Sequence, residues 1–535
     1  MITTEAAVLV YLPDPFGVRE AVFWLRNPDG TGLRLTATEI SALKTPFVTV
    51  DLAVLTDELR RTDHPVPEHP VDVADALRLL VGQPRDEGGE RRWDVWNRLQ
   101  GFCAVPDTAR TFRALFKAQS PWPELDDVLG IMRSIADALA RLWMATAHDL
   151  HKLGEWHRFA SIEAPVQAIF AARQYAGIAV DQGEAERLLR NLTDEKYKAY
   201  VAVAEAIGAS PTGLNFWTIA PYLSRTDAAD LGGETDGGNL RDAFRLAAGR
   251  SSFANAFLRL VEAGQDEAII RRTSGFEDRL HPTFSVLGTV SGRILVSDPY
   301  LQQLRRRYRG VVAADAGKRL IYLDYAQFEP GVLAFLSADA ELLKAYNEGD
   351  LYTKLAEAVF GDPEARPLAK RMFLAFSYGM SAASVARLIT APNDVGLRTS
   401  RAAIVAGFFD AFPGLAAYKR RMERVLEEQG FVSTLEGNLR RRTGTGELSA
   451  KERRWAVNQP IQGTAALIFK EALVSLAETF GRDAILLPVH DAVLMQFNED
   501  ENFDTAVKTA KLAMCEAFKR RCPTVRSRVT AGVFA

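Results

Sequence analysis

The sequence predicts a mixed α/β protein with two or more domains, and three observations support this prediction. A chain of 535 residues is longer than one small hydrophobic core supports. Short apolar runs alternate with helix-patterned stretches over roughly the first quarter of the chain. In the second half, two apolar runs of strand character each lead to an aspartate, and amphipathic stretches separate them. We therefore expect a small α/β domain followed by a larger one.

The composition is typical of a soluble globular protein, with 47% hydrophobic and 25% charged residues. A net charge of −3 does not by itself indicate a nucleic-acid partner. Arginines nevertheless cluster at residues 305–309 and 440–442, where either phosphate contact or a solvated face would explain them. Three cysteines without metal-ligand spacing predict reduced thiols. We find no signal peptide and no apolar run of about 20 residues, so we expect a cytoplasmic protein without membrane spans.

The first region, residues 1–155, has the pattern of a small α/β domain. Asp51 follows an apolar run and precedes a helix-patterned stretch, so we interpret it as a turn or capping residue. Beyond this region, residues 182–272 are mostly helix-patterned, apart from a loop rich in Gly, Asp and Thr at residues 230–239. Within the first region, strand or helix signals occur at residues 6–11, 20–25, 47–55, 71–80 and 126–153.

A buried strand is predicted at residues 320–323, and it places Asp324 at its end. A helix follows, with Pro330 in its first turn and an apolar face on residues 332–336. A strand-end carboxylate beside a helix start suits a metal ion and a phosphate. Because Asp also caps helices, this pattern alone is more typical of a cap than of a metal site.

A second helix is predicted over residues 366–381, with Pro367 at its first helical position. Lys370, Leu374 and Tyr378 recur every four residues and therefore share one face. A cation, an apolar side chain and an aromatic ring on one face, with Arg366 at the positive end of the helix, would bind a triphosphate and stack on a base.

A β-hairpin is predicted over residues 484–497, with His490 and Asp491 in its turn. If this hairpin lies beside the strand that carries Asp324, the two carboxylates can hold two divalent cations for phosphoryl transfer. A further helix over residues 451–473 places Arg454, Asn458 and Gln462 on one face, which suits either minor-groove contact or a solvated surface.

Together these stretches resemble the motifs of family A (DNA polymerase I-like) nucleotide polymerases. The resemblance extends from about residue 159 to the end of the chain, and five motifs occur in the family's order. They are the stretches GTVSGRILVSDPYLQQ at residues 288–303, DYAQFEP at 324–330, the RxxxK and YG helix at 366–379, NQPIQGTAALIFK at 458–470 and VHDA at 489–492.

The resemblance implies a right-hand polymerase fold of mixed α/β class with palm, fingers and thumb. Its polymerase domain would span residues 156–535, preceded at residues 1–155 by an exonuclease-like domain. Because residues 6–25 lack the acid pair of a proofreading nuclease, we expect that domain to be inactive. The expected subdivision is a thumb at about 182–275, a palm at about 276–338 and 431–535, and fingers at about 339–430.

Site residues are implied by the matching positions. Asp324, Asp491 and the backbone carbonyl of Tyr325 would bind two Mg²⁺ ions, with Mn²⁺ as an alternative, and Lys370 would act beside them in catalysis. Glu329 would exclude a ribose 2′-OH. The nucleotide-binding positions are Gln327, Glu329, Tyr352, Arg366, Lys370, Leu374 and Tyr378. The DNA-binding positions are Arg293, Gln302, Gln303, Arg454, Asn458, Gln462 and His490.

The expected partners are primer-template DNA and deoxynucleoside triphosphates, and we expect a monomer encoded by a bacterium, a phage or a plasmid. Leu374, where most members have an aromatic residue, and Ala492, where most have an acid, depart from the family pattern. These departures leave open a single-subunit RNA polymerase-like or ribonucleotide-tolerant enzyme. A DNA-binding relic without catalysis is the second alternative, although both principal acids are present.

Overall fold

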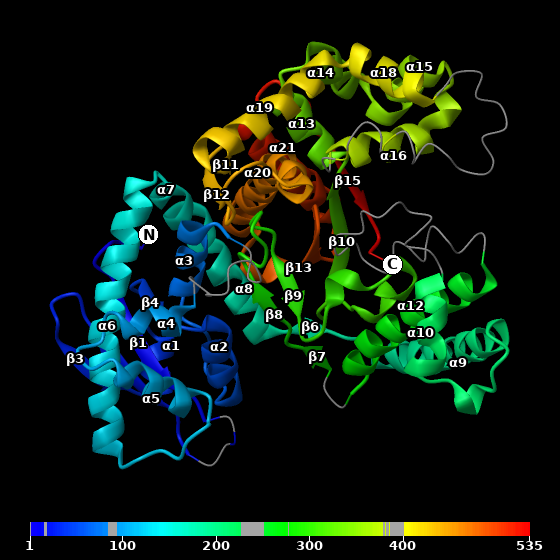
Figure 1. Ribbon diagram of the computed structural model, residues 1–535. Coiled ribbons are helices and arrows are strands. Elements are labelled where there is room, and N and C mark those ends of the chain that lie inside the picture. Colours follow the sequence, from blue (N-terminus) through cyan, green and yellow to red (C-terminus); the bar gives the residue numbers. More distant parts are fainter. Residues whose placement is uncertain are drawn as a thin grey trace. The chain divides into compact units, whose positions relative to one another are not determined.

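The computed structural model describes residues 2–14, 16, 19–83, 94–225, 251–275, 278–377, 380, 385 and 401–534. The chain divides into two compact units. The first contains Met1–Ala176, Thr283–Leu295 and Lys318–Gly532, and the second contains Gly177–Pro282, Val296–Gly317 and Val533–Ala535. Both are mixtures of helices and strands, which confirms the predicted α/β class (Figure 1). The expected loop at 230–239 lies outside the described residues.

The N-terminal part of the first unit is built on a five-stranded sheet in the order β3-β2-β1-β4-β5. The central strand β1 (Ala7–Leu12) is buried along its whole length, because six apolar residues in succession give both of its faces to a core. It pairs antiparallel with β2 (Val22–Arg26) and parallel with β4 (Phe47–Thr49). The edge strands are β3 (Gly32–Leu35) and β5 (Pro70–Asp72).

Helices complete this part of the chain, and the longest is α6 (Leu125–Lys152), which confirms the predicted helix there. Met132, Leu139 and Trp143 of α6 are buried in the same apolar core as β1. The other helices are α1 (Ala37–Ser41), α2 (Leu52–Arg61), α3 (Val73–Val81), α4 (Val95–Gln100), α5 (Asp107–Phe116), α7 (Trp156–Arg158), η1 (Phe159–Glu163) and α8 (Ala164–Ala176).

The second sheet of this unit has four antiparallel strands in the order β13-β14-β10-β15. Two long helices, α20 (Ala450–Phe480) and α21 (Phe503–Arg521), share its core, and apolar residues such as Leu473, Val493 and Phe518 are fully buried there. The strands are β10 (Lys318–Tyr325), β13 (Ile485–Val489), β14 (Ala492–Asn498) and β15 (Val529–Gly532). The predicted strand and hairpin around Asp324 and Asp491 are therefore confirmed. The expected burial of residues 320–323 is wrong except at Leu323, since Leu320, Ile321 and Tyr322 are only partly buried.

A helical layer follows β10 in the sequence. It begins with α13 (Phe328–Ser337), where Pro330 occupies the first turn as predicted. α16 (Arg366–Ser377) confirms the second predicted helix through Ser377, and Tyr378 and Gly379 lie outside the described residues. The layer also contains α14 (Ala340–Glu348), α15 (Leu351–Phe360), η5 (Pro363–Ala365), α18 (Arg401–Ala411) and α19 (Pro413–Gln429). The remaining elements of the first unit are β8 (Thr283–Ser285), η6 (Arg482–Ala484) and the hairpin of β11 (Phe431–Thr434) and β12 (Gly437–Arg441).

The second unit is mostly helical, as the sequence predicts. Its main feature is the pairing of α9 (Gln182–Ala206) with α12 (Ser252–Thr273), which bury Leu192 and Ile270. The short strands β6 (Ile178–Ala179) and β7 (Arg279–Leu280) pair antiparallel. Its other elements are η2 (Pro211–Gly213), α10 (Phe216–Arg225), η3 (Leu301–Gln303) and η4 (Arg306–Val311), while β9 (Leu295–Ser297) crosses the boundary between the units. Among the described helices, none is long and apolar enough to cross a membrane.

Candidate active site

Asp324 and Asp491 lie at the same end of the two central strands of the four-stranded sheet. Asp324 lies near the end of β10, directly opposite Ala492 on the antiparallel strand β14. Asp491 is the residue before Ala492, in the turn that His490 forms with a φ of 56°. On the other side of β10, Thr530 donates a hydrogen bond of 3.3 Å to the carbonyl oxygen of Asp324. Strand pairing therefore places the backbones of both aspartates at the same end of the sheet.

Burial raises the pKa of the Asp491 carboxyl, and the positive charges of Arg293 and His490 oppose this shift. A half-buried carboxylate of this kind gains stability from a divalent cation, which favours its charged form. Carboxylate and carbonyl oxygens are the donors that Mg²⁺ and Mn²⁺ accept. Within the described part of the chain, no cluster of three or more His, Cys, Asp or Glu side chains could hold a metal ion.

One face of α16 carries the predicted triphosphate ligands. Arg366 and Lys370 are exposed and Leu374 is partly exposed, while the intervening Met372 and Phe373 are buried. The guanidinium carbon of Arg366 and the ammonium nitrogen of Lys370 lie 5.5 Å and 5.8 Å from the ring centroid of Tyr352. The structure thus brings Arg366, Lys370 and Tyr352 together as a cationic patch on an aromatic ring.

Asp350 also belongs to this cluster, although its sequence pattern does not predict a site residue. Its carboxylate accepts two hydrogen bonds from Arg366, of 3.1 Å from Nε and 2.7 Å from Nη2. It also accepts one of 2.8 Å from Nε2 of Gln327, which brings this predicted nucleotide ligand to the same cluster. One feature of the sequence could have indicated this role: Asp350 directly precedes the start of α15 and caps it. A capping carboxylate uses one oxygen for a helix amide, so its second oxygen can accept from another donor.

Glu329 and Arg293 form an ion pair with each other. The Glu329 side chain is only 9% exposed and that of Arg293 is 33% exposed. Glu329 belongs to the first turn of α13, where the positive helix end also favours its carboxylate. Between Asp324 and Glu329, the Tyr325 ring stacks on Phe328 at 4.2 Å, and the Tyr325 hydroxyl donates to the Met514 carbonyl. These contacts hold the backbone of this motif in place.

The predicted DNA-binding residues are divided between the two units, with those on α20 and in the hairpin turn in the first unit. Arg454, Asn458 and Gln462 are partly exposed on α20, on which most neighbouring positions are buried, so they share one accessible stripe as expected. His490 is exposed in the hairpin turn beside Asp491. Gln302 and Gln303 belong to the second unit; Gln302 is 9% exposed and accepts a hydrogen bond from the Val296 amide, and Gln303 is exposed.

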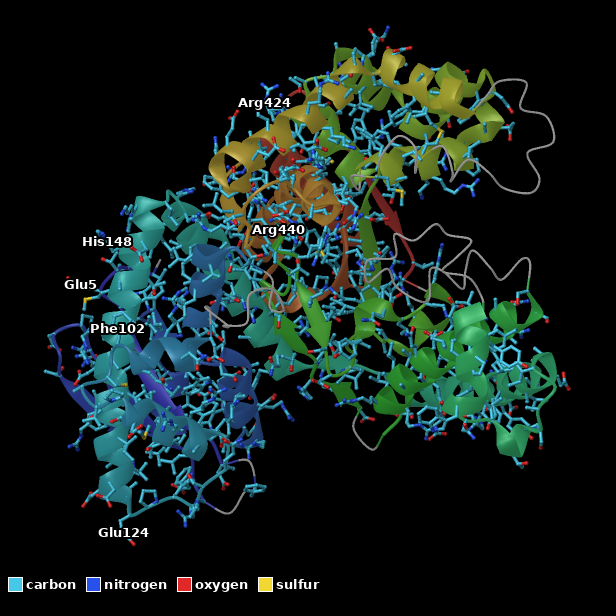
Figure 2. All side chains as sticks on the ribbon, in the orientation of Figure 1. Glu5, Phe102, Glu124, His148, Arg424 and Arg440 are labelled. Carbon is cyan, nitrogen blue, oxygen red and sulfur yellow. The ribbon has the colours of Figure 1, made fainter. Side chains whose placement is uncertain are left out.

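The two arginine clusters make contacts within their own units. In the second unit, Arg305 pairs with Glu262 and Asp266. In the first unit, Arg442 pairs with Glu452 at 2.8 Å, and Arg440, labelled in Figure 2, lies over the ring of Trp455. Arg305 and Arg442 thus pair with carboxylates of the same chain. These ion pairs reduce the positive charge that the two clusters offer to a phosphate backbone.

A buried ionic group lies behind the Asp491 turn and was not predicted. Lys470 of α20 donates to Glu163 at 2.5 Å, and Nε of Arg158 donates to the same carboxylate at 3.0 Å. All three side chains are at most 1% exposed. A small cavity is lined by both Lys470 and Asp491. The group therefore lies close to the turn that carries Asp491.

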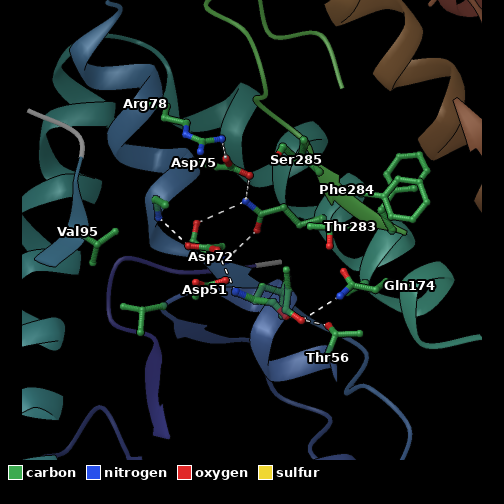
Figure 3. Close-up of a pocket in the computed structure, with 18 of the residues that line it drawn as sticks. Asp51, Thr56, Asp72, Asp75, Arg78, Val95, Gln174, Thr283, Phe284 and Ser285 are labelled. Carbon is green, nitrogen blue, oxygen red and sulfur yellow. Dashed lines mark hydrogen bonds and ion pairs between the residues drawn. The ribbon is translucent and has the colours of Figure 1, made fainter. Parts of the chain in front are cut away.

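A cavity of about 350 Å³ lies in the first unit near the N-terminal sheet, lined by Asp51, Asp72 and Asp75 (Figure 3). Asp51 accepts a hydrogen bond from the Val54 amide and caps α2, as predicted. Asp72 accepts hydrogen bonds from the Leu52 and Ala74 amides. These carboxylates serve local backbone and side-chain contacts. The exonuclease-like character of this region stays a prediction.

Comparison with known proteins identifies the family. The family model described as DNA polymerase family A matches residues 258–533. The thermostable DNA polymerase I of Thermus thermophilus is 34% identical over 270 residues, which cover 46% of this chain and 31% of the relative. DNA polymerase I of Pseudomonas aeruginosa is 34% identical over 247 residues, covering 42% of this chain and 26% of the relative. The chain thus spans about a third of the length of these curated relatives.

Among solved structures, the POL domain of Pol1 from M. smegmatis, in complex with DNA primer-template and dNTP, is similar to this chain with a TM-score of 0.76. The sequences are 22% identical, and the likeness covers 98% of this chain and 94% of that one. This likeness shows the fold and confirms the predicted polymerase architecture. Because the family model covers more than half of the 535 residues, the chain belongs to DNA polymerase family A.

Proposed function

We propose that this protein is a template-directed DNA polymerase that adds deoxynucleotides to a primer 3′-OH. The observation that carries this proposal is the strand register that pairs Asp324 with Ala492 and so brings Asp324 next to Asp491. The proposed partners are primer-template DNA and deoxynucleoside triphosphates, which the related M. smegmatis structure contains. We further propose a monomer in the cytoplasm of a bacterium, with a chromosomal, phage or plasmid gene.

The proposed metal ligands are Asp324, Asp491 and the backbone carbonyl of Tyr325. Two Mg²⁺ ions there, or Mn²⁺ in their place, would lower the pKa of the primer 3′-OH and neutralise the β- and γ-phosphates. The raised pKa of Asp491 supports this assignment, because a nearby cation compensates a carboxylate that burial disfavours.

Two residues of α16 provide the positive charge for the triphosphate. Arg366 binds it as a fixed bidentate donor, and Lys370 binds it and donates a proton to the leaving pyrophosphate. Tyr352 and Gln327 complete the nucleotide site from the side of β10 and α15. Leu374 continues the Arg366 and Lys370 face and contacts the base, together with Tyr378.

DNA contact and sugar choice rest on the remaining predicted positions. Glu329 occupies the space of a ribose 2′-OH and thereby favours deoxynucleotides, and its ion pair with Arg293 keeps its carboxylate in place. The stripe of Arg454, Asn458 and Gln462, together with Arg293, Gln302, Gln303 and His490, contacts primer and template. No acid lies on β1, whose sequence is AVLVYL, so the N-terminal region supports the fold or the DNA without proofreading.

Primer extension on a labelled hairpin with Mg²⁺ tests this function. Wild type should extend with deoxynucleotides and not with ribonucleotides. Asp491→Asn should lower the rate by at least about a thousand-fold, because metal stabilisation worth several kcal/mol is lost. Glu499→Gln is the matched control, since Glu499 is an exposed acid just after β14 and should extend at the wild-type rate.

Three outcomes would contradict the proposal. Extension by Asp491→Asn at the wild-type rate would show that this carboxylate holds no essential metal. A wild-type protein that binds the duplex but extends with no nucleotide would be a DNA-binding relic, and efficient extension with ribonucleotides would indicate an RNA polymerase-like enzyme.

A further inference from the structure

Asp350 joins three elements of the proposed nucleotide site through one carboxylate. It is the N-cap of α15, where Oδ1 accepts from the Thr353 amide at 2.9 Å. Oδ1 and Oδ2 also accept from Nε and Nη2 of Arg366 on α16, at 3.1 Å and 2.7 Å. Oδ2 accepts from Gln327, which lies between β10 and α13, at 2.8 Å. Two parallel bonds to one guanidinium form the strongest common geometry for an arginine and a carboxylate.

The Arg366–Asp350 ion pair is accessible to solvent. The Arg366 side chain is 44% exposed and the Asp350 side chain is 38% exposed. Partial burial by itself would raise the pKa of the Asp350 carboxyl, but the hydrogen bonds from Arg366 and Thr353 outweigh it and lower the pKa. The hydrogen bond to Asp350 likewise raises the pKa of Arg366. Both groups are therefore charged near neutral pH, and an anion from solvent can reach the guanidinium.

The same guanidinium belongs to the cationic patch on the Tyr352 ring. Lys370 lies one helical turn after Arg366 on the exposed face of α16, and both cations are near the ring of the buried Tyr352. Two like charges one turn apart repel each other, and an anion between them relieves this repulsion. In the described structure, the anion bound to Arg366 is the carboxylate of Asp350.

We propose that Asp350 is an internal counter-anion of the triphosphate site, which occupies Arg366 while the site is empty and releases it to polyphosphate. This inference rests on the proposed function, since it assumes that Arg366 and Lys370 bind a triphosphate. Binding then exchanges one carboxylate for phosphate oxygens on the same donors. The exchange weakens the binding of free polyphosphates, and this favours release of the pyrophosphate product.

The test is the affinity of the full-length protein for inorganic tripolyphosphate, measured by titration calorimetry at low ionic strength with EDTA present. Asp350→Asn retains a side-chain oxygen that can cap α15 but removes the charge that competes for Arg366. It should bind tripolyphosphate about 3- to 5-fold more tightly, the factor that corresponds to an exposed ion pair of roughly 0.7 to 1 kcal/mol. Asp350→Ser, which also caps a helix, should behave in the same way if the Asn variant folds poorly.

Two further variants assign the effect to Arg366. Asp362→Asn removes one exposed negative charge that caps the preceding turn, and among the described residues no ion pair joins Asp362 to Arg366, so its affinity should equal that of wild type. In an Arg366→Gln background, Asp350→Asn should give no tightening. Equal or weaker binding by Asp350→Asn, or tightening that persists without Arg366, would overturn the proposal.

This experiment separates the inference from the function on which it rests. Tripolyphosphate binding is measured without metal, DNA or turnover, so its outcome does not depend on primer extension. A protein that fails to extend a primer but shows the predicted tightening still has an anion site with Asp350 as its counter-anion. A protein that extends normally and shows no tightening is a polymerase in which Asp350 has only a capping role.

Discussion

Replacing Glu163 by Gln should strongly destabilise the contact that α20 makes with η1, which leads directly into α8. In the wild type, one fully buried carboxylate neutralises Lys470 at 2.5 Å and Arg158 at 2.9 Å. Burial opposes the charged form of Glu163, yet these two cations outweigh it and lower its pKa. Glutamine retains the shape and one acceptor but leaves two cations in a site closed to water.

Two physical costs limit the free energy that the Glu163→Gln variant loses. Removing one partner of a buried ion pair costs about 3 to 5 kcal/mol, since the other charge is left uncompensated. Lys470 can instead release its proton, at about 1.4 kcal/mol for each pH unit between pH 7 and an ordinary lysine pKa of about 10.4, or roughly 5 kcal/mol. The cheaper route applies, so we expect a loss of about 3 to 5 kcal/mol.

Amide hydrogen exchange of peptides from α8 and α20 measures this loss locally, without assuming that a chain of this size unfolds in one step. The loss should shrink as pH rises towards 10, because the folded variant then binds fewer protons at Lys470 than the unfolded chain does. Glu163→Gln combined with Lys470→Met should recover at least half of it. An opening free energy within 1 kcal/mol of wild type for Glu163→Gln, or a double variant no more stable than the single one, would refute this reasoning.

Two further predictions concern other buried positions. Gly331→Ala should lower stability by about 1 to 2 kcal/mol in thermal unfolding despite its better helix propensity, because the added Cβ would lie 2.7 Å from the buried ring of Tyr346. The same change at Gly407 meets no atom within 4 Å and should stabilise, so a loss there, or none at Gly331, would contradict this account. Burial raises the pKa of the Asp72 carboxyl to about 7, and the negative charges of Asp75 and Asp51 add to this shift. The folded chain therefore retains a proton at Asp72 that the unfolded chain releases near pH 4. Wild-type stability should therefore fall between about pH 4 and 7 relative to Asp72→Asn, and parallel melting-temperature profiles of the two proteins would contradict it.

Sequence patterns of a few residues predict the local elements that carry the candidate site residues. Residues 320–323 are apolar and strand-forming, and they place Asp324 at a strand end without help from distant contacts. The hairpin around His490 and Asp491 and the spacing of Arg366, Lys370 and Leu374 on one helix face also depend on neighbours within a few residues. Periodicity and turn chemistry act at this range, and for that reason these predictions are confirmed.

Tertiary structure alone decided which distant residues neutralise one another. Lys470 and Glu163 are 307 positions apart, and nothing in the pattern around either predicts that they share a site. The contact of Asp350 with Arg366 depends on how α15 packs against α16. Glycine at position 331 is explained only by the Tyr346 ring that fills the space beside it. Charge pairing and close packing depend on distances in space, and a pattern along the chain records only distances in sequence.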